Sequence, residues 1–260
     1  TGVINTAGID RNALESKMHN ALERLYPRGP DQQGKFVDDK SYLVHSRLSI
    51  LDITDAGKQP MLKHNRALVY NGEIYNFKSI KEKLLSFGYK FFSNSDTEVL
   101  LAGWDKWGEK LLDLLDGMFA FAIWDKNNEE LILARDPYGK KPLYYSIEDD
   151  NVFFSSDLKS LEKIKDCRNI NHEAVESLFK YRFIYEPLTI YKDVFKLPAG
   201  HILKVKKGKA EIKKWYSIPN NNLINDKKEI NSKIINIFDD AVSKRLISDV
   251  PIGLLLSGGI

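Results

Sequence analysis

The sequence has almost no cysteine and no marked excess of either charge. Cys167 is the only cysteine in 260 residues, so no disulfide can form within the chain, which fits a reducing cytoplasm. The 39 basic side chains nearly balance the 36 acidic ones, and the dispersed lysines give no reason to expect a nucleic-acid partner. We therefore predict a cytoplasmic protein that does not bind nucleic acid.

Long apolar runs, a secretory leader and metal-binding motifs are also missing. No apolar stretch approaches the ~20 residues that a membrane-spanning helix needs, so we expect no membrane association. No signal-peptide pattern is visible, and we predict no metal-binding residue. The sequence starts with Thr1 rather than methionine, which predicts that the native protein has residues before it.

The residues that are present suit a folded α+β protein. Apolar residues make up 43% of the chain and aromatic residues 11%, which is enough for a substantial core. Helical spacing and capping residues predict helices over residues 10–25, 76–88, 95–107 and 172–181. The β-like segments are 1–8, 41–51 and 66–71, and three hairpins pair 118–125 with 130–136, 142–147 with 152–156, and 201–205 with 210–215. Helix–sheet–sheet–helix layers would bury both sheets, although periodicity alone does not give the layer order.

A change in composition near residue 217 marks the start of a second unit. Residues 217–228 hold four asparagines and a proline and are the best linker candidate. Apolar residues at helical spacing follow over 230–242, and the apolar run 251–256 predicts a strand that leads into Ser257, Gly258 and Gly259. A strand followed by such a loop is suited to a pyrophosphate, because its backbone N–H groups are not screened by side chains. The alternative is a simple glycine turn after a strand.

Five polar segments occupy places that secondary structure alone does not demand, namely 28–31, 45–50, 70–76, 95–98 and 134–145. Together they resemble the glutaminase domain of the glutamine-hydrolysing asparagine synthetases, which are class II amidotransferases with an N-terminal nucleophile. The resemblance runs in order from Thr1 to Ile260 and includes residues 197–201 and the terminal Ser-Gly-Gly loop. One departure is Pro27, which stands where family members usually have histidine.

The resemblance implies a division of the chain into two domains. Residues 1–212 would form a four-layer αββα sandwich of the N-terminal-nucleophile hydrolase type. Residues 213–228 would be a linker, and residues 229–260 would begin an α/β synthetase domain of the ATP-pyrophosphatase (PP-loop) type. In that domain Leu255, Ser257, Gly258 and Gly259 would contact the nucleotide.

Charged residues suited to a free amino acid occur in three of the polar segments. Arg47 carries a planar fork that can hold a carboxylate, and Asp96 and Glu73 can accept an ammonium group. The resemblance implies these roles for Arg47 and Asp96 in glutamine binding, with backbone contacts from Ile50 and Glu73. The structural alternatives are a surface ion pair for Arg47, helix capping for Asp96 and a solvated turn for Glu73.

Asn71 and Gly72 form the oxyanion hole in the arrangement that the resemblance implies. The Asn71 amide and the Gly72 N–H would stabilise the tetrahedral intermediate, and the lack of a Cβ at Gly72 would leave room for substrate. The alternative is a type I′ hairpin turn, which the Asn-Gly dipeptide strongly favours.

The resemblance also implies a nucleophilic cysteine three residues before Thr1, with its own α-amine as general base. Thr1 itself is an alternative N-terminal nucleophile, although the offset argues against it. Cys167 is interpreted as a structural thiol. Without the cysteine and the rest of the phosphate loop, residues 1–260 alone are expected to be inactive.

The function implied by the resemblance is the synthesis of asparagine from aspartate, glutamine and ATP, with Mg²⁺ and ATP bound by the synthetase domain. The partners implied by the resemblance are these small molecules and a second subunit in a homodimer. Two alternatives remain open. One is an amidotransferase of the same build that aminates a different carboxylate, such as a sugar acid or a surface-polysaccharide precursor. The other is a glutamine-binding module that has lost its nucleophile.

Overall fold

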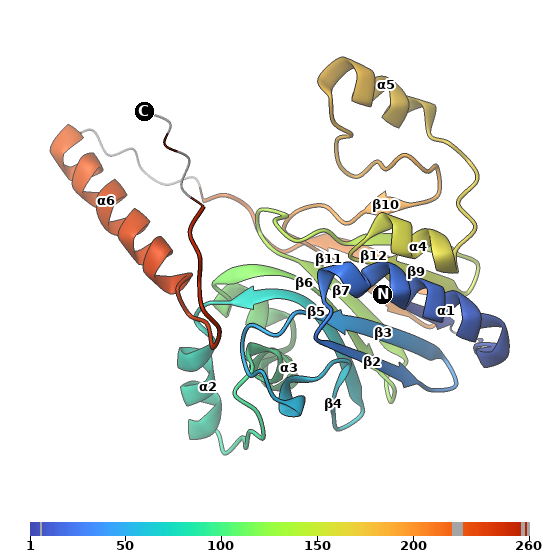
Figure 1. The fold of residues 1–260 in the computed structure, drawn as a ribbon, viewed down its shortest axis with the longest axis horizontal. Coiled ribbons are helices and arrows are strands. Elements are labelled where there is room, and N and C mark those ends of the chain that lie inside the picture. The colour runs from blue at the N-terminus through green and yellow to red at the C-terminus, as the bar shows by residue number, and fades with distance from the viewer. Residues whose placement is uncertain (6, 220–225, 256–257, 259–260) are drawn as a thin grey trace.

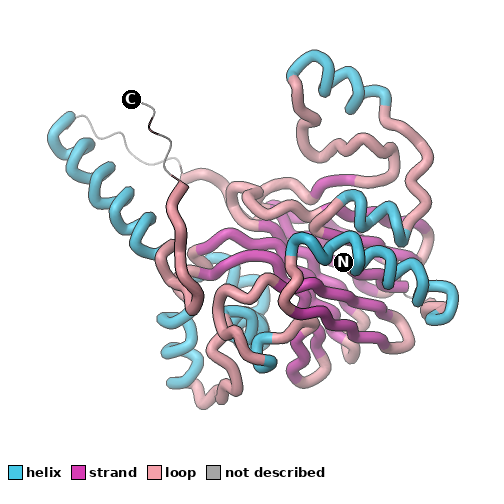
Figure 2. Tube along the Cα trace, in the orientation of Figure 1, coloured by secondary structure: helices cyan, strands magenta, loops and turns pink. Residues whose placement is uncertain are grey.

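The computed structural model describes residues 1–5, 7–219, 226–255 and 258. In this part of the chain two antiparallel sheets lie face to face, and helices cover their outer surfaces (Figure 1). Figure 2 shows the strands gathered in the middle of the molecule with the helices outside them.

The first sheet has the strand order β10-β8-β9-β1-β3-β2. Its strands are β1 (Gly2–Asn5), β2 (Gln32–Val37), β3 (Ser41–Arg47), β8 (Tyr144–Glu148), β9 (Asn151–Ser155) and β10 (Phe195–Lys196). The short strand β1 is central because it pairs with β3 on one side and with β9 on the other.

The second sheet has the order β12-β11-β7-β6-β5-β4. Its strands are β4 (Met61–Lys63), β5 (Arg66–Ile74), β6 (Gly117–Asp125), β7 (Glu130–Arg135), β11 (His201–Lys206) and β12 (Lys209–Lys214). β5 and β6 pair over nine residues, from Arg66 opposite Asp125 to Ile74 opposite Gly117.

The period-two alternation of β5 explains how one strand serves two apolar layers. Ala67 and Val69 face the first sheet and belong to the core between the two sheets. Leu68 and Tyr70 face the other way, into the core beneath α2 (Phe77–Ser86) and α3 (Asp96–Trp107). On the far side, α1 (Arg11–Leu25) and α4 (Leu158–Ile164) cover the first sheet. The predicted αββα sandwich is therefore confirmed.

Helix caps fix where several of these elements begin. The Asp10 carboxylate accepts the N–H groups of Asn12 and Ala13 and starts α1 as predicted. The Ser95 hydroxyl caps α3 by accepting the N–H of Glu98. The Glu98 carboxylate does not form a capping box with Ser95, because it accepts instead from the N–H groups of Phe92 and Ser93.

Several hairpins and helices agree with the predicted ranges, including α5 (His172–Tyr181). The hairpin turn considered for Asn71 and Gly72 is wrong, because both residues lie inside β5 and pair with β6. β12 runs to Lys214, two residues beyond the domain boundary expected at 212.

The second unit is represented by α6 (Lys227–Lys244) and the segment after it. The helix predicted for 230–242 is present, but the strand predicted for 251–256 is wrong for 251–255, which pair with none of the described strands. A strand is stable only when a neighbour satisfies its backbone, and Leu255 is fully exposed. Of the predicted nucleotide contacts, Gly258 is exposed, and a Cβ built on it would have no described atom within 4 Å, whereas Ser257 and Gly259 lie outside the described residues. No described helix combines the length and apolar character needed to cross a membrane.

Candidate active site

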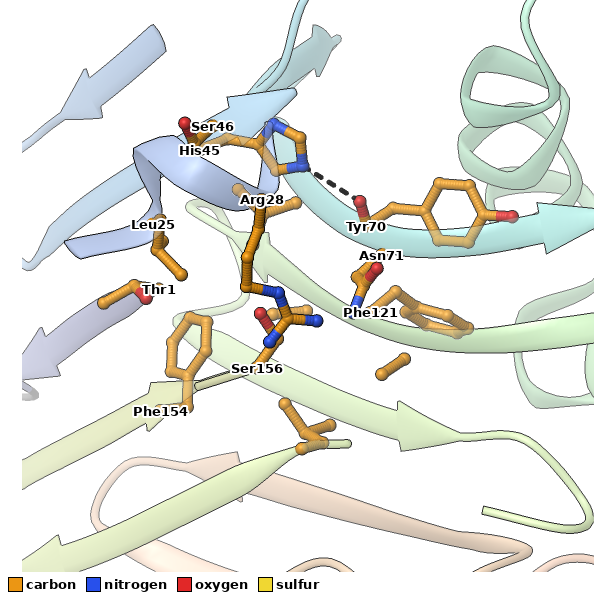
Figure 3. A pocket seen from close by; sticks show the side chains of 14 residues that line it. Thr1, Leu25, Arg28, His45, Ser46, Tyr70, Asn71, Phe121, Phe154 and Ser156 are labelled. Atoms are coloured by element: carbon orange, nitrogen blue, oxygen red, sulfur yellow. Dashed lines mark hydrogen bonds between the residues drawn. The ribbon is translucent and has the colours of Figure 1, made fainter. Parts of the chain in front are cut away.

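Two adjoining cavities open at the end of the sandwich where β3 and β5 come together. One, of about 90 Å³, lies between the sheets (Figure 3), and the other, of about 220 Å³, lies beside it. They share five lining residues: Arg28, His45, Ser46, Tyr70 and Asn71. The second cavity is lined by all six residues predicted to form the glutaminase site, namely Arg47, Ile50, Asn71, Gly72, Glu73 and Asp96.

Asn71 reaches the cavity from β5. Its side-chain Nδ2 is buried and has no acceptor in the described part of the chain. A buried amide donor without a partner costs free energy, and such groups are rare in folded proteins. The Asn71 amide is thus a fixed donor aimed into a space where an acceptor atom can be placed.

Gly72 follows Asn71 and brings its backbone to the same edge of β5. Tyr70 N–H donates to Gln59 Oε1 at 2.7 Å, and Ile74 N–H donates to an Asp96 carboxylate oxygen at 3.0 Å. Because the N–H direction alternates along a strand, the N–H of Gly72 points to this edge between those two groups. A Cβ at Gly72 would lie 2.2 Å from the Met118 carbonyl oxygen, so only glycine fits this close approach to β6.

Asp96 lies at the start of α3, and its carboxylate is almost completely buried in the cavity wall. It accepts hydrogen bonds from the Tyr70 hydroxyl at 2.8 Å and from Ile74 N–H at 3.0 Å. Burial raises the pKa of Asp96 to about 6, although both hydrogen bonds favour the charged form. Since Ser95 caps α3, the capping alternative does not account for the position of Asp96.

Arg47, the last residue of β3, is 6% exposed and also lines this cavity. Its two terminal nitrogen atoms donate four hydrogen bonds, to Gln32 Oε1 and to the carbonyl oxygens of Leu51, Asp52 and Thr54. No carboxylate in the described part of the chain forms an ion pair with it, so the surface ion-pair alternative is wrong. Arg47 therefore shapes the loop over residues 51–54, and to bind a carboxylate with its fork it would have to exchange some of these bonds.

Ile50 and Glu73 complete the predicted set. Ile50 lies in the loop after β3, and its carbonyl oxygen accepts the N–H of Asp249 at 3.0 Å. Glu73 is half-buried in β5, and burial raises the pKa of its carboxyl group against the opposing effect of nearby Lys141 and Arg245. Glu73 is thus a strand residue rather than a residue of a solvated turn.

His45 lines both cavities, although the sequence predicted no role for it. Its Nε2 bonds to the carbonyl oxygen of Tyr70 at 3.0 Å, as Figure 3 shows, and its Nδ1 is buried without a partner among the described residues. With the carbonyl as acceptor, the proton is assigned to Nε2, which leaves Nδ1 as a free acceptor. Burial lowers the pKa of His45 to about 3, so the ring stays neutral. The sequence feature that could have indicated a role for His45 is its position two residues before Arg47, on the same face of β3.

The sequence offers Thr1 as an alternative nucleophile, and Cys167 is predicted to be a structural thiol. The Thr1 hydroxyl lies 2.7 Å from Ser155 Oγ and 3.0 Å from Ser160 Oγ, so it is held by the first sheet and α4. Cys167 lines neither cavity, and burial raises the pKa of its thiol to about 11. No three His, Cys, Asp or Glu side chains gather as a metal site within the described ranges.

Comparison with known proteins accounts for this arrangement. Residues 1–216 match the family described as "Glutamine amidotransferase domain". The chain belongs to the glutamine amidotransferase family. Residues 233–260 match a second family, described as "Asparagine synthase".

Curated relatives of this amidotransferase chain are considerably longer than it is. An "Asparagine synthetase [glutamine-hydrolyzing] 1" of Bacillus subtilis (strain 168) is 35% identical over 100% of this chain and 42% of its own length. A "Putative asparagine synthetase [glutamine-hydrolyzing] 2" of Methanocaldococcus jannaschii is 38% identical over 94% of this chain and 51% of its own length. The chain thus spans about half or less of these relatives.

Among solved structures, the glutamine phosphoribosylpyrophosphate amidotransferase of B. subtilis has a TM-score of 0.51 to this amidotransferase chain. It is 21% identical and covers 69% of this chain and 36% of its own chain. At that identity the likeness extends to the fold alone, and it agrees with the four-layer sandwich.

Proposed function

We propose that this chain is the glutaminase part of a glutamine-hydrolysing asparagine synthetase. The observation that carries the proposal is the Asn71 amide, a buried donor without an acceptor that opens into the same cavity as Asp96. Gly72 adds a backbone N–H at the same edge. Two converging donors beside a buried carboxylate suit a substrate that carries both a carbonyl group and an ammonium group.

The charges of the cavity fit an amino acid such as glutamine. Asp96 would take the α-ammonium group, and the positive charge of that group would keep the carboxylate ionised on binding. Arg47 and the backbone near Ile50 would hold the α-carboxylate, and Glu73 would assist at the ammonium group. The side-chain amide of glutamine then extends toward Asn71 and Gly72.

The register of β1 supports a nucleophile at this place. Thr1 and Val44 exchange backbone hydrogen bonds, and Gly2 pairs with Leu43. Continued backwards, this register places a residue three positions before Thr1 opposite Arg47. Gly2 and Ile4 face the space between the sheets, so by the period of two that residue faces the same space. The cysteine predicted there would project toward the cavity.

The proposed reaction uses these groups together with the predicted cysteine. The cysteine sulfur adds to the amide carbon while its proton passes to the α-amine. The oxyanion accepts hydrogen bonds from Asn71 Nδ2 and the Gly72 N–H. The C–N bond breaks, the leaving nitrogen takes the proton as ammonia, and water hydrolyses the thioester to glutamate. A neutral His45 cannot protonate this ammonia.

The synthetase half of the proposal rests on residues 233–260 and on the names of the relatives. It comprises ATP as the activating cofactor and aspartate as the acceptor of ammonia. Mg²⁺, a cytoplasmic location and assembly as a homodimer are proposed from the sequence and its family resemblance alone. Leu255 and Gly258 are exposed, and Ser257 and Gly259 lie outside the described residues, so the nucleotide contacts are proposed from the sequence alone.

The test is product analysis with the full-length protein, aspartate, ATP, Mg²⁺ and glutamine labelled with ¹⁵N in its side chain. We expect labelled asparagine together with glutamate. Replacing the predicted N-terminal cysteine by alanine should abolish glutamine use and leave synthesis from ammonium chloride. Labelled ammonia without asparagine would refute the proposed acceptor, and absence of glutamate would refute the glutaminase.

A further inference from the structure

The last residue of α6 and the segment that follows it are anchored on the glutaminase domain at several points. Lys244 Nζ lies 2.9 Å from an Asp116 carboxylate oxygen, and the Arg245 guanidinium lies over the Tyr75 ring at 4.7 Å. Ile247 packs against the core beneath α2 and α3. The last anchor is Asp249, which contacts the loop that borders the candidate active site.

Asp249 holds this loop through two hydrogen bonds, one as acceptor and one as donor. Its carboxylate accepts the N–H of Asp52 at 2.7 Å, and its own N–H donates to the carbonyl oxygen of Ile50 at 3.0 Å. Asp249 and Asp52 are 197 residues apart in the sequence, so this contact joins the second unit to the first. Asp52 is 6% exposed, and its N–H would lose this acceptor if the Asp249 carboxylate were removed.

Asp52 connects Asp249 to the candidate active site through two further hydrogen bonds. Its carbonyl oxygen accepts a hydrogen bond from Arg47 Nη2 at 2.6 Å, and its carboxylate accepts the N–H of Asn94 at 2.7 Å, two residues before Asp96. Its φ of 53° lies in the left-handed region, which aspartate adopts more readily than most residues. The bond from Asp249 therefore supports the one loop conformation in which the carbonyl oxygens of Leu51, Asp52 and Thr54 can hold Arg47.

We propose that Asp249 is a positioning residue for glutamine binding: it holds the loop over residues 50–54 and, through Asp52, the guanidinium of Arg47. This inference rests on the proposed glutaminase function. The catalytic donors Asn71 and Gly72 belong to β5, which pairs with β6 along its whole length and does not depend on the loop. Loss of the Asp249 contact should therefore weaken glutamine binding without slowing the chemical step.

The position of Asp249 links this effect to the second unit. It lies nine positions before Gly258 of the predicted nucleotide loop, so a ligand at that loop that displaces Asp249 would change the loop over residues 50–54. Coupling of this kind is reciprocal: if a nucleotide changes the affinity for glutamine, glutamine changes the affinity for the nucleotide by the same factor.

The test measures glutaminase kcat and KM in the full-length protein for Asp249→Ala, Asp249→Asn and Lys244→Ala. For Asp249→Ala we expect the KM for glutamine to rise about three- to tenfold, because one hydrogen bond to a partly exposed carboxylate is lost. The kcat should stay within about twofold of the wild-type value. Asp249→Asn keeps an acceptor oxygen and should restore most of the affinity. Lys244→Ala breaks another anchor of the same segment without touching the loop and should leave KM unchanged.

An unchanged KM in Asp249→Ala, or an equal rise in Lys244→Ala, would overturn the proposal. Hydrogen exchange tests the positioning role independently of the proposed glutaminase function, because the measurement needs no turnover. We expect faster exchange over residues 50–54 in Asp249→Ala than in the wild-type protein, and equal exchange would overturn the positioning role. A wild-type protein that hydrolyses no glutamine would refute the glutaminase itself, even if the exchange result held.

Discussion

The Tyr70 hydroxyl donates a hydrogen bond of 2.8 Å to the buried carboxylate of Asp96. This bond joins the strand that carries Asn71 and Gly72 to the helix that carries the predicted ammonium-binding group. It also adjusts the charge of that group, because it lowers the pKa of Asp96 against the larger opposing effect of burial. The side-chain amide and the α-ammonium group of a bound glutamine would thus be bound by a strand and a helix that this hydrogen bond connects.

The pKa of Asp96 predicts how glutamine binding depends on pH. The free site has a pKa of about 6, and only the ionised carboxylate attracts an ammonium group. Below pH 6 the affinity for glutamine should therefore fall by up to about tenfold per pH unit, and above pH 7 it should level off. Calorimetric titration of the full-length protein between pH 5 and 8 would measure this.

Tyr70→Phe removes a donor that favours the ionised form, so it should move the midpoint of this profile to higher pH. Asp96→Asn should abolish the dependence together with most of the affinity. A profile that is flat from pH 5 to 8 in the wild-type protein would show that Asp96 does not bind the ammonium group.

Asn71→Ala tests the oxyanion hole. Removal of the Nδ2 donor should lower glutaminase kcat by about 10²–10³-fold while KM changes little, since the bond strengthens as negative charge develops. Steady-state glutamate release measures both constants. Asn65→Ala, an exposed asparagine just before β5, is the matched control and should behave as wild type. A kcat for Asn71→Ala within a few-fold of the control would contradict this role.

Gly72→Ala tests the close approach of β5 to β6. The added Cβ would meet the Met118 carbonyl oxygen at 2.2 Å and Phe119 Cα at 2.8 Å, both of which are backbone atoms. We expect loss of glutaminase activity and a destabilisation of about 1–3 kcal/mol, seen as a lower Tm. Gly253→Ala, with no atom within 4 Å of its Cβ position, should change neither. Normal activity in Gly72→Ala would mean that the backbone at this position is not part of the site.

Arg47→Lys tests whether the loop depends on a planar fork. A lysine has one nitrogen in place of the two that hold Gln32 and the carbonyl oxygens of the loop, so several acceptors lose their partner. We expect a rise in the KM for glutamine and a lower Tm. Arg11→Lys, in an exposed ion pair with Asp39, should leave the free energy of unfolding within about 0.5 kcal/mol. Equal thermal stability of the two variants would contradict the account.

Much of the fold could be predicted because local patterns and tertiary packing agree. α5 follows from the Asn171 cap and helical spacing, and the hairpin of β6 and β7 follows from two apolar runs around a polar turn. The exceptions show where packing prevails. Asn71 and Gly72 carry a strong turn signal, yet β6 pairs with β5 across both residues and keeps them in the strand. β2 was not predicted because its first residues are polar, and it is defined by its pairing with β3.

The membership of the candidate site was predictable, but its internal bonds were not. The six predicted residues come from three separate segments, 45–50, 70–76 and 95–98, and the structure brings them to one cavity. The bonds from Arg47 to the loop over residues 51–54 could not be predicted, because every residue type has a main-chain carbonyl group. The contact of Asp249 with Asp52 was equally hidden, because it depends on how two distant segments pack. A role for His45 could not be predicted, because it depends on which buried groups surround the ring.

The most direct test is a crystal structure of the full-length protein with its predicted N-terminal cysteine replaced by alanine and with glutamine bound. We predict that the side-chain carbonyl oxygen of glutamine lies about 3 Å from both Asn71 Nδ2 and the Gly72 nitrogen, with the α-ammonium group at Asp96. Glutamine bound elsewhere, or bound here with its side-chain amide turned away from Asn71, would contradict the account.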